Sequence, residues 1–181
     1  MSNQGSDSKE QRDAERVILA KLAETLSQEY GRPIRLDHPK PKAWNMEMDG
    51  YCPEPLIFVE AWARIGVASP SQQHKVMTDF FKMRFAEDLA GQKAHMILAV
   101  MSQDCTKFLQ GKSWKKSAAE RYGIEVRLVE VPIETLESVQ KAQIRQGEKQ
   151  IRSLPAIPET MAQLSGPNTF LDDDLETAQE A

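Results

Sequence analysis

Two carboxylates stand where neighbouring β-strands would bring them together. Glu60 lies in the middle of the apolar run L-I-F-V-E-A-W-A-R-I, and Asp49 ends the run N-M-E-M-D just before it. A carboxylate buried in a strand costs several kcal/mol unless a partner offsets its charge. Two acids on adjacent strands, followed by a segment rich in Gln, His and Lys, therefore indicate a divalent-metal site.

The helix predicted over 70–89 offers two lysines, Lys75 and Lys82, as partners for these acids. They are seven residues apart and share one helical face, with Asp79 between them. A helix that runs back along the strand reaches the depth of Glu60 near Lys82, whereas Lys75 lies nearer the end of the strand. Lys75 is preferred because Q-Q-H-K concentrates polar groups, but geometry leaves the choice open.

The spacing of apolar residues predicts four helices and five strands. Ser69-Pro70 is a strong helix start, with Ser as the N-cap and Pro at the first helical position. The predicted helices are 9–30, 70–89, 104–122 and 134–151, and the predicted strands are 34–36, 44–51, 56–65, 93–101 and 124–131.

The order α-β-β-β-α-β-α-β-α predicts an α/β fold. The later strands alternate with helices, which favours parallel pairing, and the short early connections favour antiparallel pairing. A single mixed β-sheet flanked by helices on both faces is expected. One domain over 9–154 is predicted, between a disordered N-terminus (1–8) and a disordered acidic tail (155–181).

This order and its two acids resemble the PD-(D/E)XK nuclease superfamily, which has the restriction-endonuclease-like fold. The resemblance covers about 9–131, and the matching segment is M-D-G-Y-C-P-E-P-L-I-F-V-E-A-W. Asp49 corresponds to the family's Asp and Glu60 to its Glu. Trp62 occupies the position of the family's Lys, and in some members that Lys lies on the following helix, where this chain has Lys75 and Lys82.

The resemblance implies a divalent-metal-dependent nuclease that cuts phosphodiester bonds in DNA or RNA. Asp49, Glu60 and the Ala61 carbonyl would bind Mg²⁺ or Mn²⁺, and a Lys would orient the attacking water. The family often has a Glu on its first helix, for which Glu15 is the first choice and Glu24 the second.

Basic residues on the helix predicted over 104–122 are candidates for contacts with phosphates, and Trp114 could stack on a base. The candidate nucleic-acid-binding residues are Lys107, Lys112, Trp114, Lys115 and Lys116. Nucleic acid is thus the expected partner, with a homodimer or a protein partner as further possibilities.

Simpler interpretations stand beside these. Asp49-Gly50 is also a turn signal, Glu60 could be a structural acid paired with Arg64 or a helix Lys, and the lysines over 107–116 could form a solvated face. A catalytically degenerate module that binds nucleic acid or protein is the alternative function, favoured by Trp62. A small-molecule enzyme is a third, but no phosphate loop, nucleophile elbow or metal-type His pair supports it.

Composition sets the remaining expectations. The net charge is −4, and the tail holds six acids and no Lys or Arg, so the rest has 21 acidic and 23 basic residues. A mildly basic body is compatible with nucleic-acid binding. Cys52 and Cys105 read as free thiols of a reducing cytoplasm, and a zinc site is not expected. No apolar stretch is long enough to span a membrane.

Overall fold

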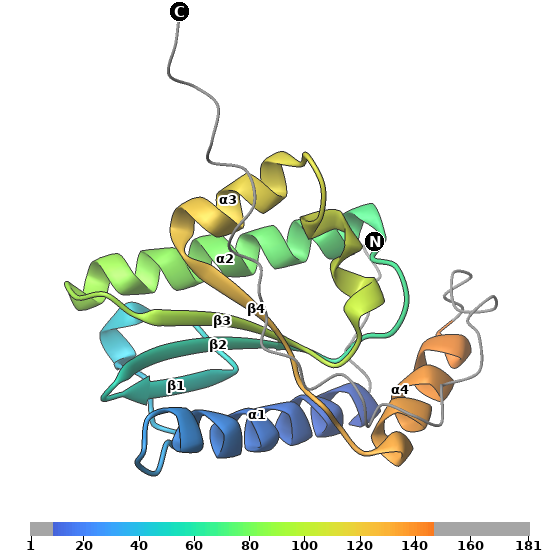
Figure 1. Ribbon diagram of the computed structural model, residues 1–181, viewed down its shortest axis with the longest axis horizontal. Coiled ribbons are helices and arrows are strands. Elements are labelled where there is room, and N and C mark those ends of the chain that lie inside the picture. Colours follow the sequence, from blue (N-terminus) through green and yellow to red (C-terminus); the bar gives the residue numbers. More distant parts are fainter. Residues whose placement is uncertain (1–8, 147–181) are drawn as a thin grey trace, which may run out of the picture.

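The computed structural model describes residues 9–146, and these form one mixed four-stranded sheet covered by helices on both faces (Figure 1). Strand β1 (Gly50–Pro53) pairs antiparallel with β2 (Leu56–Trp62). Strands β3 (His95–Val100) and β4 (Ile124–Leu128) follow β2 in parallel. The predicted mixed sheet with flanking helices is confirmed. The N-terminus predicted over 1–8 and the tail predicted over 155–181 lie outside the described residues.

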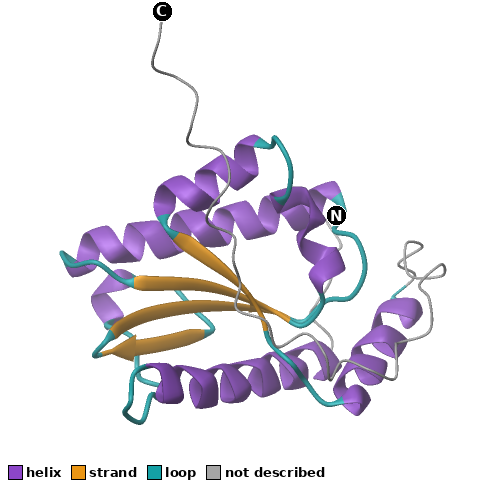
Figure 2. Cartoon of the chain, in the orientation of Figure 1, coloured by secondary structure: helices purple, strands orange, loops and turns teal. Residues whose placement is uncertain are grey.

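Each face of the sheet has its own hydrophobic core (Figure 2). Helices α1 (Lys9–Glu29) and α4 (Ile133–Arg145) pack on the face that carries Ile57, Val59 and Ala61. Helices α2 (Pro70–Ala90) and α3 (Trp114–Tyr122) cover the other face, which carries Phe58 and Trp62. Alternate residues of β2 thus enter opposite cores, as a strand buried on both faces requires. None of the described helices is long and apolar enough to cross a bilayer.

The early strands are shorter and fewer than predicted. Segment 34–36 forms no strand, and only an isolated parallel bridge joins Asp37 to Tyr51. Segment 44–51 begins with the short 3-10 helix η1 (Lys42–Trp44), and Asn45 then has a left-handed backbone with φ 47°. An extended run cannot pass through that conformation, so the strand begins only at Gly50. The expectation of strands over 34–36 and the whole of 44–51 was therefore wrong.

The hairpin turns at C-P-E-P, between Pro53 and Leu56, as predicted. Gly50 lies within β1 opposite Val59, so Asp49-Gly50 is not the turn. A Cβ on Gly50 would lie 2.9 Å from Leu19 Cδ2 and 3.0 Å from Val59 Cβ. Glycine is needed here because the strand approaches α1 and β2 closely, and this approach fixes the position of Asp49.

The helix predicted over 104–122 is two helices. The 3-10 helix η2 (Gln103–Leu109) ends before Gly111, which has a φ of 67°, and Ser113 then caps α3. The Ser113 hydroxyl accepts hydrogen bonds from the N–H groups of Lys115 and Lys116. Ser113 is therefore the N-cap of α3. The left-handed glycine and the new cap explain why the continuous helix was wrong.

Candidate active site

Asp49 and Glu60 meet at the open edge of β2. Pairing of β1 with β2 ends at Gly50 and Val59, so Asp49 lies one position further, beside Glu60. An Asp49 side-chain oxygen accepts a hydrogen bond of 2.8 Å from the Ala61 N–H. The carboxylate thus takes the place of a missing strand partner, and this holds Asp49 against the strand that carries Glu60.

Glu60 is buried within the sheet and only 4% exposed, on the face that α2 covers. The Lys82 ammonium lies 2.7 Å from Glu60 Oε1 and 3.3 Å from Asp79 Oδ1. An ammonium this close to a carboxylate oxygen is a charge-assisted contact, so Lys82 is the cation that partners Glu60 Oε1.

Three acids and two lysines determine the electrostatics of this cluster. Burial, with Asp49 and Asp79 nearby, raises the pKa of Glu60 to about 8 against the opposing effect of Lys82. Burial also raises the pKa of Asp79, although Lys82 and Lys75 act in the opposite direction. Burial lowers the pKa of Lys82, but Glu60 and Asp79 outweigh it and the net shift is upward. With every group ionised the cluster carries one net negative charge, which a cation would offset.

The backbone supplies a third oxygen at the same edge. The N–H and C=O groups of one strand residue point to the same side of the strand. Because the Ala61 N–H points to Asp49, the Ala61 carbonyl also lies on the side of β2 that β1 leaves open.

The acids and the backbone oxygen at this edge resemble an open Mg²⁺ site more than a closed metal cage. Within residues 9–146, no set of three or more His, Cys, Asp or Glu side chains is arranged so that it could hold a metal ion by itself. Mg²⁺, however, takes one or two carboxylates and keeps several waters or substrate oxygens. The carboxylates of Asp49 and Glu60, with the Ala61 carbonyl, fit that donor set.

Trp62 cannot stand in for the family's lysine. Its side chain is 4% exposed and packs edge-to-face on Phe108, with the ring centroids 6.3 Å apart. Of the two helix lysines, Lys82 is the one that contacts Glu60. It is the lysine that was expected to reach the depth of Glu60 along the strand. Lys75, which the Q-Q-H-K pattern favoured, lies closer to the end of β2, where it is exposed.

Glu15 and Lys75 line a cavity next to the acids. The cavity has a volume of about 120 Å³ and lies between the first turns of α1 and α2, beyond the end of β2. Trp62, Arg64 and Gln72 also line it. The second choice on the first helix, Glu24, lies elsewhere, exposed and 3.0 Å from Lys21. The structure thus brings Glu15 toward Lys75, and Asp49 and Glu60 toward Lys82.

The predicted nucleic-acid-binding residues are divided among several elements. Lys107, on η2, pairs with Asp104, and Lys116, on α3, pairs with Glu120. Lys115 reaches across to Gln73 on α2 and lies 5.6 Å over the Phe108 ring, next to Trp62. Lys112 is exposed in the loop, and Trp114, at the first position of α3, is 68% exposed. Lys115 is the lysine of this group for which a contact with α2 is seen.

Asp79 was missed as a site residue, although its position between Lys75 and Lys82 was the signal that could have found it. Gln73 was also missed, although the polar Q-Q-H-K run that contains it was the signal that could have found it. No known protein family, curated protein or solved structure that was compared with this chain matches it. The class of protein must therefore be argued from the acids, the lysine and the sheet that positions them.

Proposed function

We propose that this chain is a divalent-metal-dependent nuclease with a restriction-endonuclease-like fold, which cuts phosphodiester bonds in DNA or RNA. One observation carries the proposal: Lys82 contacts buried Glu60 at 2.7 Å, while Asp49 is hydrogen-bonded to the neighbouring Ala61. An acid pair and a lysine at one strand edge is the donor set that metal-assisted hydrolysis of a phosphodiester needs.

The residues have separate roles in this proposal. Asp49, Glu60 and the Ala61 carbonyl would hold Mg²⁺ or Mn²⁺, and the chemistry that such an ion supplies is activation of water and shielding of phosphate charge. Lys82 would hold the attacking water and stabilise the negative charge that develops on the phosphate. Asp79 would position Lys82, because its Oδ1 lies 3.3 Å from the Lys82 ammonium.

The substrate strand would reach this edge past the exposed side chains of the η2–α3 region. Lys115 lies over Phe108 and contacts Gln73, so its charge is near the first turns of α2. Trp114 offers an exposed aromatic ring on which a base could stack. Lys112 would add a phosphate contact, whereas Lys107 and Lys116 must first leave Asp104 and Glu120.

A catalytically degenerate module is the second candidate, and the same ion pair favours it. Lys82 already offsets part of the charge on Glu60 and Asp79, and a structural ion pair needs no metal. In that case the chain would bind nucleic acid or a protein without cutting. Metal binding separates the two candidates.

The test is a cleavage assay with supercoiled plasmid, single-stranded DNA and RNA in Mg²⁺, Mn²⁺ or EDTA. Glu60→Gln and Asp49→Asn should abolish metal-dependent cutting, and Lys82→Met should slow it about 100-fold or more. Glu137→Gln and Lys141→Met are matched controls, because this i,i+4 pair on α4 is exposed. Cutting that survives both acid substitutions would overturn the proposal.

A second readout needs no turnover. Mg²⁺ should raise the melting temperature of the wild-type protein relative to EDTA, because a ligand that binds only the folded state stabilises it. Glu60→Gln should remove most of that increase, while Glu137→Gln should retain it. Equal increases in all three proteins, together with no cutting, would leave the degenerate module as the better description.

A further inference from the structure

The cavity beside the acidic cluster has the composition of a phosphate site. Arg64 and Lys75 bring two positive charges to its wall and Glu15 brings one negative charge. The Ser71 hydroxyl and the Gln72 side chain add polar groups from the first turn of α2. Trp62 supplies an apolar wall. The charges of Arg64, Lys75 and Glu15 sum to +1, and a net positive, partly enclosed space attracts an anion.

The cavity is also connected to the acidic cluster through α2. Lys75 is electrostatically coupled to Asp79, which lies 3.3 Å from Lys82. From Lys75 to Lys82 the helix rises ~10 Å. An anion held at Lys75 would therefore lie ~10 Å along α2 from the level at which Lys82 contacts Glu60.

We propose that this cavity binds one backbone phosphate of a single nucleic-acid strand, beside the phosphate that is cut. The inference rests on the proposed function, and it names the substrate: a single strand or an unpaired end. About 120 Å³ accepts a phosphate with part of its sugar. The backbone of a single strand bends easily enough to place one phosphate between the first turns of α1 and α2, whereas a duplex is stiff and bends only at a cost in free energy.

The effect of Glu15 on the affinity for the strand distinguishes this proposal from a purely catalytic role. A carboxylate in the wall repels a bound phosphate, so its removal should strengthen binding of the strand. A purely catalytic role for Glu15, as the family resemblance implies, would leave binding in EDTA unchanged. The two roles thus differ in a measurement that involves no cutting.

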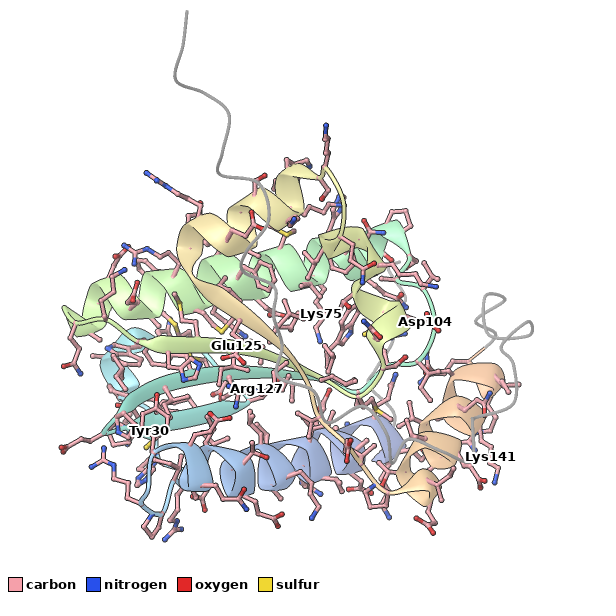
Figure 3. The ribbon with its side chains drawn as sticks, viewed as in Figure 1. Tyr30, Lys75, Asp104, Glu125, Arg127 and Lys141 are labelled. Carbon is pink, nitrogen blue, oxygen red and sulfur yellow. The ribbon has the colours of Figure 1, made fainter. Side chains whose placement is uncertain are left out.

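The experiment measures fluorescence anisotropy of a labelled oligothymidylate, alone or paired with oligodeoxyadenylate, in EDTA over a range of salt. The variants are Lys75→Gln, Glu15→Gln and the control Lys141→Gln, which lies on α4 and apart from Lys75 in Figure 3. For a single strand, each lost phosphate contact lowers the slope of log K against log salt by about 0.7. The wild type should bind the single strand more tightly than the duplex.

Lys75→Gln should lose that increment of slope, Lys141→Gln should keep it, and Glu15→Gln should bind more tightly than the wild type. The proposal is overturned if Lys75→Gln matches Lys141→Gln, or if the duplex binds as tightly as the single strand. Cutting in Mg²⁺ that depends on Glu60 but not on Lys75 would remove this inference alone. Binding that depends on Lys75 without any cutting would instead remove the proposed nuclease.

Discussion

Glu60 is the central residue of the candidate site, because the fold raises its pKa. Its ordinary value of 4.5 rises to about 8 through burial and through the charges of Asp49 and Asp79. Lys82 is the residue that opposes this rise. A structural acid with a matched partner would keep an ordinary or lowered pKa, whereas the pKa of Glu60 stays raised although Lys82 lies beside it. Such perturbed groups are typical of functional sites.

The first prediction concerns stability against pH, measured in EDTA by chemical unfolding. Below pH 4.5 Glu60 is protonated in both the folded and the unfolded chain, so it makes no difference. As the pH rises toward about 8, the unfolded chain releases this proton first, and the folded state loses stability relative to it. Glu60→Gln cannot titrate, so its stability relative to that of the wild type should increase across this pH range, by about 5 kcal/mol at completion.

The control for this prediction is Glu137→Gln, whose exposed carboxylate pairs with Lys141. Its difference from the wild type should stay nearly constant across the same pH range. A Glu60→Gln profile that runs parallel to the wild type from pH 4.5 to 8 would contradict the raised pKa.

At the scale of elements, α2 carries both the chemistry and its own start signal. Ser69 accepts a hydrogen bond from the Gln72 N–H, and the Gln72 side chain accepts one from the Ser69 N–H. This capping box fixes where the helix begins, and so how far along β2 each lysine lies. The register of Lys75 with the cavity and of Lys82 with Glu60 follows from that starting point.

Ser69→Ala should destabilise the protein by about 1 kcal/mol, because the Gln72 N–H loses its acceptor. Denaturant unfolding measures this loss. Thr78→Ala is the matched control on the same helix, since the Thr78 hydroxyl is exposed and bonds only to the His74 carbonyl. Equal stabilities of the two variants would mean that the cap does not hold the helix.

The sequence could predict much of this element but not its orientation. Ser69-Pro70, Gly91 and the shared face of Lys75 and Lys82 follow from local rules, and all agree with the structure. The choice of Lys82 over Lys75 depends on how α2 lies against β2, which no local rule contains. The aromatic pair on α2 makes the same point, because Phe80 is fully buried and Phe81 is 67% exposed.

The early strands mark the other boundary of sequence-based prediction. Trp44, Met46 and Met48 alternate as in a strand, and all three pack on the core beneath α2. They do so from an irregular segment, because Asn45 adopts a left-handed backbone. Alternation therefore predicted which side chains are buried but not the conformation that buries them, since tertiary packing can satisfy the pattern without a ladder.

At the scale of the whole molecule, a polar network ties α1 to the strands far from the candidate site. Tyr30, just after α1, hydrogen-bonds His95 Nδ1 at 3.0 Å, and His95 Nε2 donates to Glu125 at 2.6 Å. Arg127 bridges Glu125 to Glu29 at the end of α1. Figure 3 shows Glu125 and Arg127 on β4 and Tyr30 at the end of α1. The network thus joins α1 to the two strands β3 and β4.

The last prediction follows from the charge of Glu125. Burial raises the pKa of this carboxyl, but hydrogen bonds from His95 and Arg127 outweigh burial and lower it to about 2. Its stabilising effect is therefore present above the ordinary value of 4.5 and is lost as the pH falls toward about 2. Glu125→Gln should be less stable than the wild type above pH 4.5 by about 1 kcal/mol after allowance for solvent screening. Chemical unfolding should show this gap closing on acidification. A gap that persists unchanged to low pH would mean that Glu125 acts through packing and not through its charge.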